Sequence, residues 1–200
     1  MADKNKAIVV AHMSLEQRDR LAERMRSVHI SRIHEMPRIE LYLDQLITLV
    51  SQELEFMQVP GESPVTGSMV NNYVKQGVIP APKKKRYTRR HVASLLFVCA
   101  LKRVFSIAQV SQLAALIWSS DLDLELLYDR SCEALEGALA RRFSPSAGAG
   151  APPTLELVNR FGEPSDPELA WLIQAAMEAL ADKVTVEQAL LLAAEEAGAR

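Results

Sequence analysis

"GSMVNNYVKQGVIPAPKKKRYTRRHV", residues 67–92, decides the fold and raises the question of function. A short, polar helical pattern runs to Gly77, a Pro-rich stretch follows, and a cluster of Lys, Arg and Tyr comes next. Thr66 is a good N-cap for a helix over 66–76, and Gly77 suits the position after that helix. The prolines favour an extended conformation for 78–82.

Charge is strongly segregated along the chain. Residues 63–120 contain no Asp or Glu but nine Lys and Arg, whereas the whole chain has a net charge of -2. The flanks are acidic or nearly balanced, with ten acids and eight bases over 1–62 and fifteen acids and six bases over 121–200. Such asymmetry predicts a polyanionic partner for the middle segment.

The composition fits a folded, soluble protein. Of the 200 residues 48% are hydrophobic and 24% charged, which argues against general disorder. The apolar run near the N-terminus is shorter than a signal-peptide core, and no stretch is long enough to cross a bilayer. We therefore expect a bacterial, cytoplasmic protein with no membrane partner.

No pattern of an enzyme or a metal site is visible. Cys99 and Cys132 are isolated, which indicates a reducing compartment without disulfides or zinc. P-loop, GxSxG, HExxH and Rossmann glycine patterns do not occur, so we predict no catalytic residues and no cofactor. The histidines lack ligand spacing, and we interpret them as surface or hydrogen-bonded residues: His12, His29, His34 and His91.

Hydrophobic periodicity predicts a mainly all-α fold. Capping boxes at Ser14–Gln17 and Ser106–Gln109 each open a helix, the first ending near Arg26. Pro37 is expected in the first turn of a helix that ends near Met57, and Thr88 to cap another helix. The expected buried faces are Leu43, Leu46, Ile47, Val50 and Leu54, then Val92, Leu95, Leu96 and Cys99, then Ile107, Val110, Leu113 and Ile117.

The acidic C-terminal part is expected to be helical as well. A long helix is predicted over 121–142, followed by a flexible linker at 144–153. A short helix is predicted over 154–161, and a closing helical pair over 165–181 and 185–197. The expected core residues of the pair are Trp171, Ile173, Met177 and Leu180.

The order of elements around the opening stretch is that of a winged helix-turn-helix. In that fold the second helix enters the major groove and the wing lies along the phosphates. Asn71 and Asn72 can pair with adenine edges, while the Lys and Arg residues neutralise phosphates. The predicted DNA-binding residues are Thr66, Ser68, Asn71, Asn72, Tyr73, Lys75, Lys83, Lys84, Lys85, Arg86, Tyr87, Arg89 and Arg90.

These residues have alternative interpretations. The basic cluster over 83–90 is also compatible with a solvated loop, and Asn71 and Asn72 with an ordinary helix surface. Tyr73 and Tyr87 fit core positions with the hydroxyl group at the rim better than stacking platforms.

"VNNYVKQGVIPAPKKKRYTRRHV" followed by "LKRVFSIAQVSQL" resembles the DNA-binding half of MerR-type regulators. The similar positions are Val70, Tyr73, Gly77, Val78, Ile79, Lys85, Tyr87, Val92, Phe105, Ser106 and Val110. Asn71 and Asn72 replace an Arg-Tyr pair of that family, and His91 stands where an acid is usual. Base specificity is therefore not carried over.

A second resemblance covers about residues 36–140. "PRIELYLDQL", then Thr66, Met69, Asn71, Asn72, Tyr73 and Lys75, then Lys84, Lys85, Arg86 and Tyr87 resemble an uncharacterised bacterial family, domain of unknown function number eighteen thirty-six. The resemblance implies little about activity, because members of that family are only presumed to bind DNA.

We therefore predict a DNA-binding transcriptional regulator with three segments. They are an N-terminal helical extension (1–35), a MerR-like winged helix-turn-helix (36–120) and an acidic helical region (121–200) for dimerisation or effector binding. Double-stranded DNA is the expected partner. The alternative is a non-catalytic interaction module whose basic face docks an acidic protein.

A homodimer is expected from the leucine content after residue 121. Leu122, Leu124, Leu126, Leu127, Leu135 and Leu139 are more apolar residues than one helix face needs. Paired half-sites also favour dimers among helix-turn-helix proteins. The acidic region is equally compatible with a pocket for an unidentified effector.

Overall fold

The computed structural model describes residues 14–143 and 153–198, and their regular secondary structure is helical. The helices are α1 (Leu15–Arg26), α2 (Leu43–Glu53), the 3-10 helix η1 (Glu55–Met57), α3 (Gly67–Lys75), α4 (Arg89–Leu101), α5 (Ile107–Ser119), α6 (Leu124–Arg142) and α7 (Pro167–Gly198). β-Structure within these residues is limited to isolated bridges. The prediction of a mainly α-helical fold is confirmed. None of the helices in the described part has the length and apolarity needed to cross a membrane.

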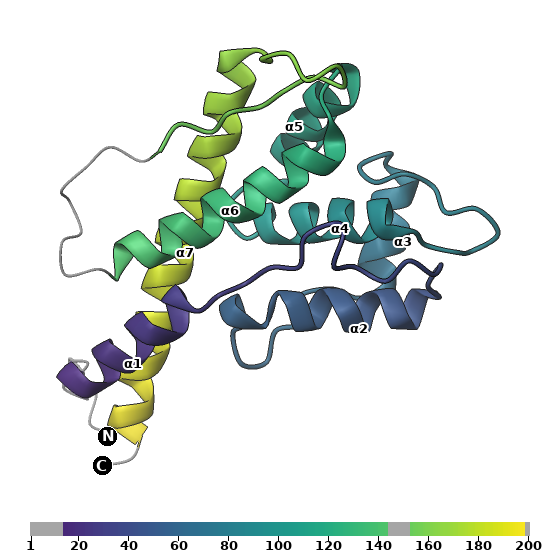
Figure 1. Cartoon of the computed structure of the whole chain (residues 1–200). Helices are drawn as coiled ribbons and strands as arrows, with labels where there is room; N and C mark the ends of the chain where they lie inside the picture. The colour runs from purple at the N-terminus through teal and green to yellow at the C-terminus, as the bar shows by residue number, and fades with distance from the viewer. Residues whose placement is uncertain (1–13, 144–152, 199–200) are drawn as a thin grey trace.

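Two long helices form the spine of the molecule. α6 packs against α7 in the most extensive helix–helix contact, and α1 lies beside both. α2 and α4 lie next to each other to one side of this spine, with α3 at their far end (Figure 1). The predicted winged segment therefore stands to one side of the acidic helices and packs on them through α4.

A single hydrophobic core runs through all three predicted segments. Met25, Leu46, Leu95, Leu139 and Leu180 come from five different helices, belong to one cluster and are fully buried. A smaller cluster joins α5, α6 and the first turns of α7 to residues 155–157. The three segments thus share their packing in the folded chain.

The predicted helix starts and buried faces are confirmed for much of the described chain. In both predicted capping boxes the serine hydroxyl accepts the N–H group three residues on, and the glutamine side chain accepts the N–H group of the serine: Ser14–Gln17 at 3.2 and 2.8 Å and Ser106–Gln109 at 3.3 and 2.9 Å. Every residue of the predicted α4 face is buried, and burial raises the pKa of the Cys99 thiol to about 12. The α2 and α5 faces are buried or partly buried.

The predicted start of the second helix is wrong. Pro37 lies outside any helix, and α2 begins only at Leu43. The intervening chain is drawn away because Leu41 pairs with Tyr87, each backbone N–H donating to the other's carbonyl at 2.8 and 3.0 Å. The helix also stops at Glu53, four residues early, and η1 continues to Met57.

The predicted helix over 154–161 is wrong. Residues 153–157 have no helical structure, and Val158 and Asn159 form β-bridges with Pro164 and Leu122. The buried Asn159 side-chain carbonyl accepts the N–H groups of Phe161 and Glu163 at 2.9 and 3.0 Å, which closes a turn. An Asn that bonds its own neighbouring backbone in this way competes with a helix.

The predicted pair of closing helices is one continuous helix, α7. Thr185, read as the start of a second helix, instead donates its hydroxyl to the Ala181 carbonyl at 2.7 Å within the helix. Ile173, Met177 and Leu180 are buried as predicted, but Trp171 is 64% exposed. The linker predicted at 144–153 lies outside the described residues except for Pro153, which is exposed.

α6 ends in a charged contact with α7. The helix begins at Leu124 because the Asp123 carboxylate caps it. Arg142 bonds Glu178 and Asp182 at 2.8 and 2.6 Å, and Arg141 also bonds Glu178. These two arginines, in the last turn of α6, therefore hold the two helices together.

Candidate nucleic-acid interface

α3 divides into a buried face and a polar face. The Thr66 hydroxyl accepts the Met69 N–H at 3.3 Å and caps the helix. Val70 and Tyr73 are buried at 0% and 3% exposure. The other face, with its exposed small polar and basic side chains, points to solvent: Thr66, Ser68, Asn71, Asn72 and Lys75.

The end of α3 fixes the direction of the following chain. Gly77 has φ +69°, and its N–H donates to Val74 O at 3.0 Å while the Val78 N–H donates to Tyr73 O at 2.9 Å. This pair of bonds is the Schellman motif, in which a left-handed residue is most easily a glycine. The predicted glycine stop is confirmed.

The basic cluster forms a tight turn. The Arg86 N–H donates to the Lys83 carbonyl at 2.9 Å, and Lys84 and Lys85 between them have φ values of 48° and 59°. A tight turn whose two central residues both have positive φ is a type I′ turn. Asn-Gly is the preferred pair at these positions, and other residues there lower the stability of the fold by about 1 kcal/mol each. We call residues 83–86 the wing; it belongs to the loop between α3 and α4 that projects from the helical body (Figure 1).

The base of the wing is anchored to the residues before α2. Besides the Leu41–Tyr87 pairing, the Arg86 guanidinium lies 3.6 Å from the centre of the Tyr42 ring. It also donates to the Tyr42 hydroxyl at 2.5 Å. Tyr42 was not among the predicted site residues; no local pattern in the sequence shows that a residue 44 positions away supports the wing.

Two predicted contact residues are not available to a ligand. Tyr73 and Tyr87 are 3% and 4% exposed, so the core interpretation holds and the interpretation as contact residues does not. The Tyr73 hydroxyl is buried without a hydrogen-bond partner rather than at the rim, and burial raises its pKa to about 12. Both rings pack in the core that supports α3 and the wing.

The start of α4 holds two further arginines and a buried histidine. Arg89 donates to the Ile33 carbonyl at 3.2 Å, whereas Arg90 is exposed. His91 is 8% exposed, and its Nδ1 accepts the Thr88 N–H at 3.0 Å in a capping box. The sequence had predicted a surface or hydrogen-bonded ring. Burial lowers the pKa of His91, and a backbone contact with Ala81 partly opposes this shift.

The basic residues of this region lack acidic partners in the described part of the chain. Of the cations over 63–120, Arg103 alone forms ion pairs there, with Glu62 and Glu187 at 3.5 and 2.6 Å. Apart from Lys102, which is exposed at the far end of α4, the other exposed or half-exposed cations are gathered on α3, the wing and the first turn of α4: Lys75, Lys83, Lys84, Lys85, Arg86, Arg89 and Arg90. Uncompensated charge of one sign raises the local concentration of anions.

Comparison with protein families identifies the family to which this region belongs. The family model described as Domain of unknown function (DUF1836) matches residues 31–131, half of the chain. The chain belongs to this family. Comparison with curated proteins and with solved structures found no match.

The DUF1836 segment contains the complete candidate interface. It runs from the Arg89 contact at Ile33 through α2, α3, the wing, α4 and α5 into the first turns of α6. The Tyr42 anchor also lies inside it. α1, most of α6 and α7 lie outside the match and pack around its core.

Proposed function

We propose that this chain is a transcriptional regulator that binds double-stranded DNA through a MerR-like winged helix-turn-helix. α3 would lie in the major groove and the wing along the phosphates. One observation carries the proposal: α3 has an exposed polar face, and the loop that follows α3 contains the wing. Three lysines of the wing, Lys83, Lys84 and Lys85, have no acidic partner in the described residues.

The residues have separate roles in this proposal. Asn71 and Asn72 are exposed amides that can pair with base edges in the major groove. Lys75, the lysines of the wing and Arg90 neutralise phosphates and carry no sequence preference. The stacking on Tyr42 occupies one face of the Arg86 guanidinium and leaves further N–H groups for a phosphate.

A second candidate function is docking of an acidic protein. Ile39 and Tyr42, beside the base of the wing, are 70% and 52% exposed. Large apolar side chains next to a cationic surface are typical of protein interfaces, where aromatic residues and arginine are enriched. This function needs neither Asn71 nor Asn72, which is how an experiment can separate the two.

We also propose a homodimer, but with a different interface from the one that the leucines suggested. The leucines that suggested it are buried or half-buried within the chain, and Leu135 and Leu139 face its core. α7 instead exposes Trp171, Val186 and Leu190 at 64%, 57% and 65%. We propose that a second copy packs along α7, which would present two wings to paired half-sites.

The proposal is tested by Asn71→Ala on a duplex selected for tight binding. We expect affinity for the selected site to fall about tenfold, about 1.4 kcal/mol, because one amide pair to a base edge is lost. Affinity for unrelated sequences should stay within twofold. Fluorescence anisotropy with labelled duplexes measures both.

Gln112→Ala is the matched control, because Gln112 is an exposed amide on α5 outside the candidate interface. It should change neither affinity. If Asn71→Ala leaves the selected site unaffected, or weakens all sequences alike, α3 does not read bases.

A further inference from the structure

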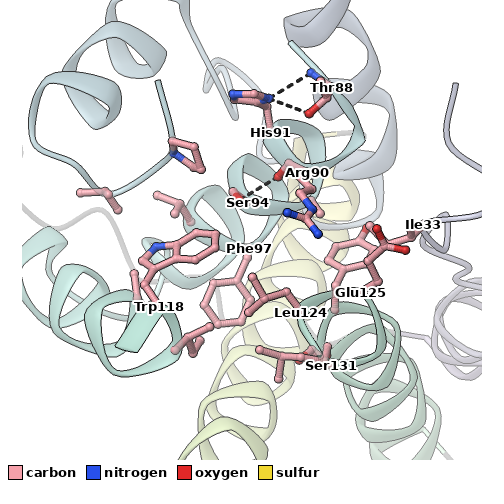
Figure 2. A pocket seen from close by; sticks show the side chains of 18 residues that line it. Ile33, Thr88, Arg90, His91, Ser94, Phe97, Trp118, Leu124, Glu125 and Ser131 are labelled. Carbon is pink, nitrogen blue, oxygen red and sulfur yellow. Dashed lines mark hydrogen bonds between the residues drawn. The ribbon is translucent and has the colours of Figure 1, made fainter. Parts of the chain in front are cut away.

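A pocket at the C-terminal end of α4 is lined by charged side chains. It has a volume of about 250 Å³ and lies between α4, α3, α7 and the chain that joins η1 to α3. The pocket between α4, α5 and α6 differs from it, because its wall is mainly apolar and includes Phe97, Trp118 and Leu124 (Figure 2). We call the first one the charged pocket, and the charged residues that line it are Glu62, Lys102, Arg103, Lys183 and Glu187.

Arg103 links the two acids of the charged pocket. Its side chain is only 14% exposed, and its Nη2 donates to the Glu187 carboxylate at 2.6 Å. Glu187 also bonds Lys183 at 2.7 Å. Burial raises the pKa of the Glu187 carboxyl, but the bonds from Lys183 and Arg103 outweigh burial, so this pKa lies below its usual value. Glu187 is therefore ionised, and its charge is shared between two cations.

The other amino group of Arg103 has a poorer partner. Nη1 lies 3.5 Å from the Glu62 carboxylate, whereas a charge-assisted hydrogen bond is usually about 2.7–2.9 Å long. The Glu62 side chain is 63% exposed, and exposed ion pairs contribute little to stability. Nε of Arg103 is buried, so Nη1 is the group that can bond a molecule in the pocket. Because a carboxylate of the chain already reaches Nη1, the carboxylate of a ligand can take its place.

The charged pocket has an excess of positive charge. Three cations and two acids line it, which leaves one positive charge. Lys102 is exposed and forms no ion pair within the described residues. The Cys99 thiol also lines the pocket, and it is uncharged at neutral pH because burial raises its pKa to about 12. The pocket therefore favours an anion with a single charge over a neutral molecule or a cation.

Part of the wall is apolar. Leu54, Met57, Pro64 and Met69 line the pocket beside the charged side chains. The thioether groups of methionines make favourable contacts with aromatic rings. A cavity of about 150 Å³ holds benzene, so about 250 Å³ leaves room for a ring that bears a carboxylate.

We infer that the charged pocket binds a small monocarboxylate with one aromatic ring, whose carboxylate displaces Glu62 and accepts a hydrogen bond from Arg103 Nη1. The ring contacts Met57 and Met69. Because Met69 belongs to α3 and Glu187 to α7, the bound molecule lies between these two helices. None of the lining residues is a predicted DNA contact, so the inference stands whether or not the chain binds DNA.

Four probes test the inference on the unaltered chain. Benzoate has the ring and the carboxylate, benzyl alcohol is neutral, benzylamine is cationic at neutral pH, and acetate lacks the ring. In an NMR spectrum of isotope-labelled methionine methyl groups, the signals of Met57 and Met69 should shift with benzoate. Met25 and Met177 are buried and do not line the pocket, so they serve as references. We expect benzoate to bind with a dissociation constant of about 1 mM, at least about fivefold more tightly than the other three probes.

Two variants locate the site, and a third is the matched control. Glu62→Gln removes the carboxylate that competes with the ligand, so benzoate should bind about fivefold more tightly. Glu55→Gln is the control, because Glu55 is exposed and lies two residues from Met57 but does not line the pocket. Its affinity for benzoate should stay within about twofold of that of the unaltered chain. Arg103→Met removes the guanidinium and should weaken benzoate at least about tenfold while changing benzyl alcohol little.

The inference is overturned if the Met57 and Met69 signals do not shift with benzoate, or if the reference signals shift alike. It is also overturned if benzyl alcohol, benzylamine or acetate binds as tightly as benzoate, or if Glu62→Gln tightens benzoate no more than Glu55→Gln does. Glu62 and Glu55 are both exposed, so neither change should unfold the chain. The result therefore does not depend on whether Arg103→Met folds.

Discussion

Arg32→Ala is expected to lower the free energy of unfolding by about 3 kcal/mol. The Arg32 guanidinium makes a two-pronged bond with the Glu136 carboxylate, at 2.8 and 2.6 Å, and the two side chains are only 14% and 18% exposed. This bond raises the pKa of Arg32 and joins the chain after α1 to α6. Its loss would leave a largely buried carboxylate with a backbone N–H group, that of Ile30, as its main partner.

Arg130→Ala is the matched control, because Arg130 pairs with Glu133 at 2.8 Å while both side chains are 48% exposed. Exposed pairs contribute little, so its effect should stay below about 0.5 kcal/mol. With a urea slope of roughly 2 to 3 kcal/mol per M, the Arg32→Ala midpoint should fall by about 1 M. Equal shifts for the two variants would mean that the Arg32–Glu136 pair does not fasten the N-terminal segment.

The double variant Lys84→Asn, Lys85→Gly is expected to stabilise the fold while weakening DNA binding. Asn-Gly is the preferred pair for a type I′ turn, so relieving two positive φ values should add about 1 kcal/mol to stability. The same change removes two cations from the wing. With about 0.9 counterions released per phosphate contact, affinity in about 0.1 M salt should fall roughly 60-fold, and the log–log salt slope should flatten by about two units.

Lys102→Asn is the control for charge alone, because Lys102 is exposed and lies at the other end of α4 from the wing. The length of α4, roughly 20 Å, exceeds the screening length of about 10 Å in 0.1 M salt. The DNA affinity of the Lys102→Asn variant should therefore stay within twofold of that of the unaltered chain. A stabilised double variant with undiminished affinity would show that the wing does not touch DNA, and a loss of stability would contradict the turn.

Features set by local chemistry could be predicted from the sequence. The Ser14 and Ser106 capping boxes, the Thr66 cap and the Gly77 stop depend on residues within four or five positions of one another. Buried faces followed from the 3.6-residue period of a helix. The polar face of α3 and the basic wing were likewise visible, because both follow from the opening stretch of sequence.

Features that depend on distant partners could not be predicted. Tyr42 supports Arg86 across 44 positions, and Leu41 is drawn out of the helix by Tyr87. Trp171 looked like a core residue because the sequence does not show which side of α7 meets α6.

Binding of the unaltered chain to a mixed-sequence DNA duplex, measured at several salt concentrations, tests the proposed function most directly. The exposed or half-exposed cations of the candidate interface are Lys75, Lys83, Lys84, Lys85, Arg86, Arg89 and Arg90. If most of them meet phosphates, the plot of log affinity against log salt should have a slope between about −3 and −5 per chain. A chain that forms no complex at about 50 mM salt, or whose affinity does not change with salt, would contradict DNA binding through α3 and the wing.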